Sequence, residues 1–358
     1  MGLLFSFFSV SILAMLAFVG VKTVGLHFLF GVVLPYAAFI IFVVGVVFRV
    51  VKWGSSPVPF RIPTTGGQQK SLPWVKYSRL DNPFTTLGVI GRMVLEVLLF
   101  RSLFRNTKVD LREGPRIAYG STKWLWLGGL AFHYTFLIIL LRHLRLFTQP
   151  IPYFVHLLEV FDGFFQVGAP VLYLTDLVFL AAVSFLFLRR VIVPQLQYIS
   201  LAADYFPLFL LGAIGVSGVF MRYFYKVDVV GVKQLTMGLI TFSPSIPKGI
   251  GVIFYMHLFL ISVLFAYFPL SKLMHMAGIF LSPTRNLANN NRFARHINPW
   301  DYPVHVHTYQ EYEDDFREKM KGAGLPVERS KHGKNTYTSR IIEDRLYPSF
   351  KGVDGYQN

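Results

Sequence analysis

Four histidines stand inside long apolar stretches of this chain, where an ionisable side chain is rare. They fall in two pairs, His133 and His143 in the stretch 124–145, and His257 and His275 in the stretch 251–276. An ionisable residue within a membrane span indicates function by default. A single such histidine is more often a hydrogen-bonded or interfacial residue, but four in two stretches indicate a shared role. Imidazole nitrogens are common metal ligands, so we first consider ligation of iron.

Their spacing places the histidines at two levels of a membrane. The first pair is ten residues apart and the second is 18 apart, which correspond in a helix to rises of about 15 Å and about 27 Å. Eighteen residues make five full turns, so the second pair would share one helix face. If the two spans run antiparallel, His133 meets His275 toward one membrane face, and His143 meets His257 toward the other. The axial spacings differ by about 12 Å, which helix tilt and approach from opposite sides must absorb.

Two imidazoles on one haem iron leave no open position for oxygen or substrate. A haem held in this way only passes electrons, at a potential tuned by its surroundings. Two such haems would form an electron path across the bilayer. Glycines in the spans would either leave room for the flat macrocycles or allow close helix packing, and they are Gly128, Gly129, Gly212, Gly215 and Gly218.

The composition predicts that an all-α, polytopic membrane helical bundle carries these histidines. The 358 residues are 53% hydrophobic and only 15% charged, against about 25% charged in soluble domains. A soluble enzyme of ordinary type and a disordered chain are therefore excluded. The chain contains no cysteine, so an iron–sulfur cluster or c-type haem attachment within it is excluded as well.

Charge patterning predicts the topology. Six stretches are long and apolar enough to span a membrane, which takes about 20 residues: 3–21, 24–50, 124–145, 171–191, 205–225 and 251–276. Thirteen Lys and Arg residues fall in 49–123, and none falls in 146–170. The positive-inside rule then predicts a multi-pass protein of the cytoplasmic membrane with both termini in the cytoplasm. The net charge of +16 reflects these loops and not binding to nucleic acid.

The same pattern predicts four parts: an N-terminal transmembrane hairpin (1–50), a cytoplasmic basic insertion (51–123), a four-helix core for two haems (124–276), and a cytoplasmic docking tail (277–358). In the insertion, 84–104 carries Arg92 and Glu96 beside an apolar stripe. We expect it to form an amphipathic helix on the membrane surface, not a span. In the tail, Thr308 and Glu311 form a capping box that predicts a short polar helix.

The double histidine spacing resembles that of the gamma-subunit family of respiratory nitrate reductase, over roughly residues 124–276. The resemblance implies two haem b groups that exchange electrons with quinone. By this resemblance, His143 and His257 would hold the outer haem, and His133 and His275 the inner one. The chain departs from the short members of the family by its extra N-terminal span, its insertion and its tail.

Two tail motifs point to a narrower group. They are Ser282-Pro-Thr-Arg-Asn-Leu-Ala-Asn-Asn-Asn-Arg and Asn298-Pro-Trp-Asp-Tyr-Pro-Val. Both resemble the tail of the membrane cytochrome b subunit of the sulfite-reduction-associated DsrMKJOP complex, to which the cytochrome b subunit of Hdr-like menaquinol oxidoreductase is closely related. This resemblance implies menaquinone as substrate, a cytoplasmic iron–sulfur partner related to heterodisulfide reductase, and further membrane or outer-side electron-transfer subunits.

The family resemblance also places quinol oxidation near the outer haem. The candidate quinone-site residues on that side are Arg142, Arg145, His156 and Glu159. His156 and Glu159 would share one face of a helix, or would simply be solvated residues of a loop helix. The two arginines would bind quinone, pair with haem propionates, or cap the span.

Two other classes of function stay open. A proton-coupled transporter could use the intramembrane histidines as a relay, but it predicts acidic partners in mid-span, and 124–141 and 251–271 contain no carboxylate. A haem-free structural membrane anchor would leave the four histidines unexplained.

Overall fold

The computed structural model describes residues 1–56, 67–114, 116–163, 170–282, 284–291, 293–294 and 307–327. The chain divides into two compact units, Met1–Asp301 and Tyr302–Asn358. Residues 57–66 of the insertion and the tail motif that begins at Asn298 lie outside the described residues.

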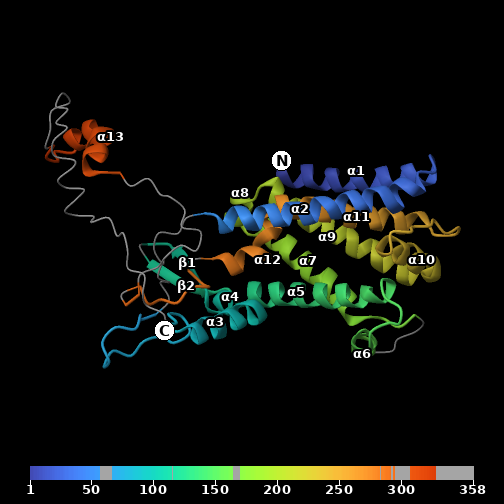
Figure 1. The fold of residues 1–358 in the computed structure, drawn as a ribbon, viewed down its shortest axis with the longest axis horizontal. Coiled ribbons are helices and arrows are strands. Elements are labelled where there is room, and N and C mark those ends of the chain that lie inside the picture. Colours follow the sequence, from blue (N-terminus) through green and yellow to red (C-terminus); the bar gives the residue numbers. More distant parts are fainter. Residues whose placement is uncertain are drawn as a thin grey trace, which may run out of the picture. The chain divides into compact units, whose positions relative to one another are not determined.

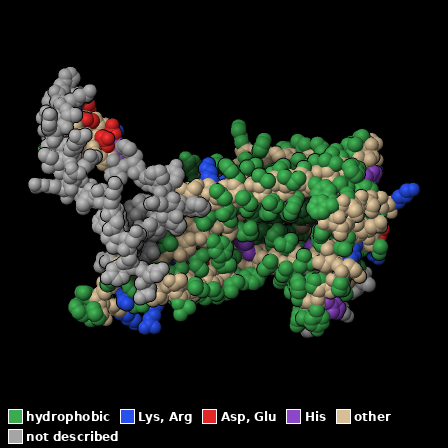
Figure 2. Space-filling model, viewed as in Figure 1, with side chains coloured by type: hydrophobic (Ala, Val, Ile, Leu, Met, Phe, Trp, Pro, Cys, Tyr) green, Lys and Arg blue, Asp and Glu red, His purple; other side chains and the backbone are tan. Residues whose placement is uncertain are grey.

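Long antiparallel helices form the body of the first unit (Figure 1). They are α1 (Gly2–Lys22), α2 (Leu34–Gly54), α5 (Lys123–His143), α7 (Leu174–Ile192), α9 (Ala202–Val219) and α11 (Val252–Tyr267). Helix α11 packs against α1, α2 and α9, and α7 packs between α5 and α9. Hydrophobic side chains also cover the outside of these helices (Figure 2), as expected where lipid and not water is the solvent. The predicted all-α membrane bundle is confirmed.

Shorter elements connect the long helices. They are the π-helical segments Leu29–Val33 and Phe220–Phe224, the helices α6 (Tyr153–Asp162), α8 (Pro194–Ile199), α10 (Val229–Ile240) and α12 (His275–Gly278), and the 3-10 turns Leu144–Leu146, Phe268–Leu270, Lys272–Met274 and Ile279–Leu281. Among the residues that the structure describes, five helical stretches are long and apolar enough to cross a membrane: Gly2–Lys22, Leu29–Gly54, Lys123–Leu146, Ala202–Phe224 and Val252–Leu270.

Helix α7 corresponds to the predicted span 171–191, which is not among these five stretches. It carries Asp176 in its first turn and Arg189 and Arg190 in its last turn, which leaves a short apolar stretch between charged ends. Its neighbours α5 and α9 are both long enough to span. The count of six spans and the side on which each terminus lies therefore stay predictions.

One predicted element is wrong in its geometry. The stretch 251–276 is not one continuous helix, because α11 ends at Tyr267 and His275 opens the separate short helix α12. Pro269 has no backbone N–H to continue the helical ladder, and Ser271 is extended, with φ −112° and ψ 178°. The argument that five helical turns place His257 and His275 on one face therefore fails.

The insertion folds into α3 (Thr86–Leu99), α4 (Arg101–Arg105) and a hairpin of two antiparallel strands, β1 (Thr107–Arg112) and β2 (Arg116–Ser121). The hairpin was not predicted. Helix α3 confirms a helix within 84–104, and its 14 residues are too few to span. Its Arg92 is buried, whereas Leu87, Ile90 and Leu98 are exposed. An exposed apolar face fits the predicted position on a membrane surface, which stays a prediction.

The described part of the second unit contains α13 (Tyr309–Gly322). The predicted capping box is confirmed, since Glu311 N donates to Thr308 Oγ1 and Thr308 N donates to Glu311 Oε2. One turn further on, Arg317 pairs with Glu313 at 2.8 Å, and both side chains are buried.

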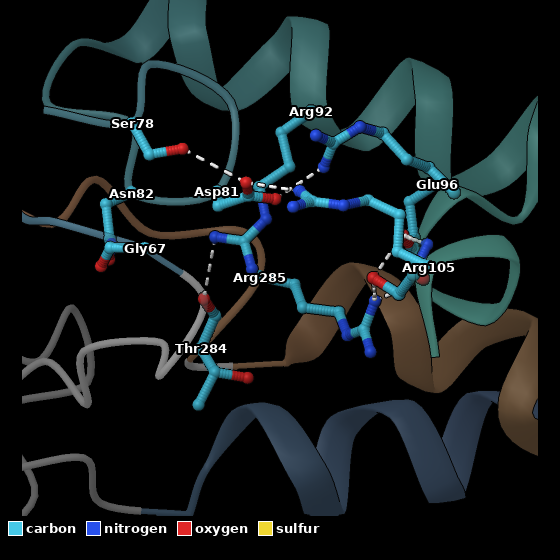
Figure 3. A network of polar contacts seen from close by, with 11 residues as sticks. Gly67, Ser78, Asp81, Asn82, Arg92, Glu96, Arg105, Thr284 and Arg285 are labelled. Carbon is cyan, nitrogen blue, oxygen red and sulfur yellow. Dashed lines mark hydrogen bonds and ion pairs between the residues drawn. The ribbon is translucent and has the colours of Figure 1, made fainter. Parts of the chain in front are cut away.

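Asp81, which precedes α3, is held among cations (Figure 3). Arg101 and Arg105 donate to its carboxylate, and Ser78 Oγ donates at 3.0 Å. Burial raises the pKa of Asp81, but these hydrogen bonds outweigh burial and hold the pKa well below its ordinary value.

Because the folded-state pKa is lowered, the stabilisation from Asp81 is present above the unfolded pKa of about 3.9 and is lost as pH falls through the folded-state pKa. We expect Asp81→Asn to destabilise the protein by about 2 kcal/mol at pH 7. Thermal unfolding in detergent measures this effect. The difference from wild type should begin to shrink below about pH 4, near the unfolded pKa, and should keep shrinking as the pH falls toward the folded-state pKa. An unchanged difference across that pH range would contradict this account of the Asp81 contacts.

Candidate functional site

The structure brings together the histidines that the sequence predicts as the inner pair. His133 lies in α5 and His275 opens α12, and their ring centroids are 6.0 Å apart with the planes at 86°. Bonds from imidazole nitrogen to a metal are about 2 Å long, so two imidazoles on opposite sides of one metal ion have centres about 6 Å apart. The observed spacing matches that of two ligands of one metal, and it is also that of an edge-to-face ring contact.

The predicted outer pair lies in α5 and α11. His143 is the last residue of α5, and His257 is buried within α11. The imidazoles of His143 and His257 lie close enough to interact electrostatically. At Gly218 of α9, an added Cβ would lie 3.4 Å from Cε1 of His257, so a larger residue there would crowd this ring.

Three of the four histidines hold Nδ1 against a backbone carbonyl. The Nδ1 atoms of His133, His143 and His275 bond to the backbone carbonyls of Gly129, Ile139 and Lys272 at 2.7, 2.7 and 2.9 Å. A carbonyl only accepts hydrogen bonds, so each of these Nδ1 atoms carries the proton and each Nε2 keeps its lone pair.

His257 reaches the same state by a different route. Its Nδ1 lies 2.8 Å from Ser217 Oγ, and that hydroxyl donates its one proton to Ile214 O at 3.0 Å. With its proton on Ile214 O, the hydroxyl can accept from His257 Nδ1, and Nε2 of this ring then keeps its lone pair as well. Metal-binding histidines almost always donate their second ring N–H to such a partner.

Room for a large planar group lies beside these rings. Among the described elements, α5 packs against α4, α6 and α7 but makes no comparably close contact with α11 or α12. Figure 2 shows histidine side chains in a hollow of the apolar bundle. A bare ring nitrogen in apolar surroundings costs free energy unless it binds something. The donor set and the hollow fit haem iron with two axial imidazoles.

The five glycines divide between the two roles that the sequence left open. Gly129 and Gly212 leave room, since they have no neighbour closer than 3.8 Å to an added Cβ. Gly128 and Gly215 instead serve close helix packing, because an added Cβ would lie 2.5 Å from the Phe185 ring or 2.7 Å from the Phe179 ring.

The two arginines among the candidate quinone-site residues form ion pairs with carboxylates of this chain. Arg142 is buried, with Asp176 at 2.5 Å, Asp162 at 3.2 Å and the Tyr173 ring 3.9 Å from its guanidinium carbon. This network ties α5, α6 and α7 together, so Arg142 has a structural role that the sequence did not reveal.

The other three candidates lie on or near α6. Arg145 pairs with Glu159 at 2.7 Å, and His156 is exposed. His156 and Glu159 are both in helix α6, and their role at a quinone site stays a prediction.

An apolar groove lies beside α10, near the end of α5 that carries His143, and the sequence did not predict it. It has a volume of about 380 Å³ and is lined by Gln149, Val229, Val230, Lys233, Gln234 and Met237. Lys233 donates to Gln149 Oε1 across it. One turn along α10, Thr236 Oγ1 donates to Leu146 O at 2.6 Å, which fastens the groove to the turn that follows His143. The available sequence signal was a short apolar run, 229–240, that contains a single lysine.

Comparison with known proteins agrees with this architecture. The family model of the nitrate reductase gamma subunit matches residues 118–295. A relative from Archaeoglobus fulgidus is 48% identical over 76% of this chain and 83% of its own length, and one from Archaeoglobus profundus is 42% identical over 75% and 81%. Both relatives are named Hdr-like menaquinol oxidoreductase cytochrome b-like subunit.

The chain belongs to the family of Hdr-like menaquinol oxidoreductase cytochrome b-like subunits, within the nitrate reductase gamma-subunit family. The predicted family is thus confirmed.

Proposed function

We propose that this chain is the dihaem cytochrome b subunit of a membrane oxidoreductase, and that it passes electrons from menaquinol to a cytoplasmic iron–sulfur partner related to heterodisulfide reductase. His133 and His275 hold the inner haem b, and His143 and His257 hold the outer one. The observation that carries the proposal is the common state of the four rings: every Nδ1 is hydrogen-bonded, and no residue that the structure describes bonds to an Nε2.

Each haem, when bound, supplies a site for one electron. The histidine ligands would limit the access of other ligands to its iron. Held by two imidazoles each, the haems would leave no position at the iron for substrate, so the chemistry they would supply is electron transfer without oxygen chemistry. The hydrogen bonds at Nδ1 fix the orientation of each ring and raise its basicity as a ligand.

A proton relay explains these rings less well. A histidine that passes protons uses both ring nitrogens, but here each Nδ1 is bonded to a carbonyl or to a hydroxyl that already donates elsewhere. A haem-free structural anchor would not need His133 and His275 at a metal-bridging distance.

The names of the relatives support menaquinol as electron donor and other subunits as partners. The charge pattern supports a cytoplasmic-membrane protein with both termini inside, and the tail resemblance supports a place in a respiratory complex of sulfur metabolism. Co-purification with mass identification of the bound subunits tests these assignments. A complex without an iron–sulfur subunit would contradict the proposed acceptor.

A visible spectrum during quinol addition tests electron entry. The purified protein should show low-spin b-type bands, and menadiol, a soluble naphthoquinol, should reduce them. Protein that carries haem but stays oxidised under menadiol would contradict quinol oxidation, while ligation by the histidines would stand.

We place the menaquinol ring in the groove between Gln149 and α10. Its volume and apolar lining suit a naphthoquinol, and most ligand sites are apolar with a few placed polar groups. The Lys233 amine and the Gln149 amide can donate to the ring oxygens. The Arg145–Glu159 pair and the exposed His156, at the same end, are candidates to accept the protons that leave on oxidation.

Lys233→Ala tests this placement. Loss of one charged donor should raise KM for menadiol about tenfold, because such a hydrogen bond contributes roughly 1.5–3 kcal/mol, while haem content stays normal. Steady-state kinetics measure the effect, and Lys248→Ala serves as control because Lys248 does not line the groove. Equal KM values in the two variants would remove Lys233 from the quinol site.

Ser217→Ala tests the orientation of His257. The variant leaves the Nδ1–H of a buried ring without its partner, so the outer haem should bind about tenfold more weakly. Redox titration with haem quantification measures this. Ser262→Ala is the matched control, since its hydroxyl is also buried but bonds only to Leu258 O in its own helix. Equal retention of the outer haem in both variants would show that Ser217 does not support His257.

A further inference from the structure

The proposed ligand His275 belongs to a segment that is too short to be stable by itself. Helix α12 has four residues, and isolated helices of this length are unstable. Before it, Met274 is fully buried and Ser271 caps the 3-10 turn. The placement of the His275 ring therefore depends on what binds the chain on either side of α12.

The chain after α12 is bound to the insertion (Figure 3). Arg285 forms an ion pair with Glu96 of α3 and donates to Ser102 Oγ of α4 at 2.7 Å. Glu96 also accepts from Ser102 N at 3.0 Å and from Ser102 Oγ at 2.7 Å. Arg92 donates to Thr284 O at 3.2 Å. The polar face of α3 is thus turned toward the segment that continues from His275.

A second contact secures the same segment. Asn289 Nδ2 donates to Asn82 Oδ1 at 2.7 Å, and Asn289 N donates to Pro83 O at 2.7 Å. Gln69 Nε2 donates to Asn289 O at 2.9 Å. Asn82 and Asn289 are almost completely buried, so this contact is part of the folded unit.

The insertion also binds α5 at the level of the other inner histidine. Phe100, the left-handed residue between α3 and α4, has its ring centroid 5.0 Å from that of His133. Tyr134 OH donates to Leu98 O at 2.9 Å, and Trp126 Nε1 donates to Leu99 O at 2.7 Å. The corner between α3 and α4 therefore contacts the helix of His133 and, through Glu96 and Ser102, the segment of His275.

We propose that this corner is a clasp, formed by Glu96, Phe100, Ser102 and Arg285, that sets the distance between His133 and His275 and so controls ligation of the inner iron. Its members are positioning residues, because they act on the iron only through the two histidines. The clasp gives the insertion a role in the haem site that its basic sequence does not indicate. The inference rests on the proposed haem ligation.

Glu96→Gln and Arg285→Gln each open the clasp and leave the four histidines unchanged. We expect about tenfold weaker retention of the inner haem, the lower end of losses seen when outer-shell support of a metal ligand is removed, and a shifted potential for the fraction retained. The outer haem reports in the same sample that the bundle is folded. Redox titration in the visible bands and electron paramagnetic resonance of the oxidised protein measure both components.

Glu313→Gln is the control, because it breaks a Glu–Arg pair in the second unit that is more deeply buried than Glu96–Arg285. Phe100→Leu is the second test if the charge variants do not fold, since it keeps the ion pair and removes the ring beside His133. An inner haem retained with unchanged potential in folded Glu96→Gln and Arg285→Gln proteins would overturn the clasp. If the purified wild-type protein contained no haem, the proposed function itself would be overturned.

Discussion

Replacing His143 or His257 with Ala should remove one and the same low-spin haem component and stop quinol oxidation. Replacing His133 or His275 should remove the other component. In the second case quinol should still reduce the outer haem, but electrons should not reach the cytoplasmic acceptor. The reason is that each iron loses one of its two imidazoles, and a haem with one strong ligand becomes high-spin or dissociates.

Redox titration of the four single variants measures this pairing. His27→Ala is a suitable control, because His27 also has its Nδ1 at 3.0 Å from a carbonyl, that of Gly25, and packs on Tyr255, but it is not one of the proposed ligands. If His133→Ala and His257→Ala deleted the same component, the assignment of the two levels would be wrong.

A chain that ends at Ala294 should keep both haems and lose its soluble partner. It retains the clasp residue Arg285 and the buried Asn289 but lacks the second unit and the segment that leads to it. We propose this distal part as the docking arm for the iron–sulfur subunit. A chain that ends at Ser282 should release the partner and also lose most of the inner haem, because Arg285 and Asn289 are gone.

Co-purification and haem quantification on the two truncated proteins separate docking from haem retention. Full partner binding by the chain that ends at Ala294 would remove the docking role from the distal tail. Equal haem content in the two truncations would show that the segment after Ser282 does not support His275.

The bundle and the histidine pairs were predictable because both depend on local patterns. Apolar runs of span length and their antiparallel succession bring His133 to His275, as the ring contact bears out. The prediction reached this pair through a wrong step, since it assumed an unbroken helix to His275. Pro269 within an apolar run is the signal that argued against that assumption.

Contacts between distant segments were not predictable. Glu96 and Arg285 are 189 positions apart, and no local period indicates that α3 turns its polar face to the tail. Arg142 illustrates the same limit, because an arginine near the end of a span fits quinone, propionate or water equally well until Asp162 and Asp176 are placed beside it. The groove at α10 likewise exists only where two separate segments meet.

Haem stoichiometry with spin state is the most direct test of the central claim. Haem extracted from the purified full-length chain should amount to two haem b per polypeptide, because the four Nε2 atoms provide two pairs of axial ligands. Electron paramagnetic resonance of the oxidised protein should show two low-spin species. Colourless protein, or a single haem with an open, high-spin iron, would contradict the account.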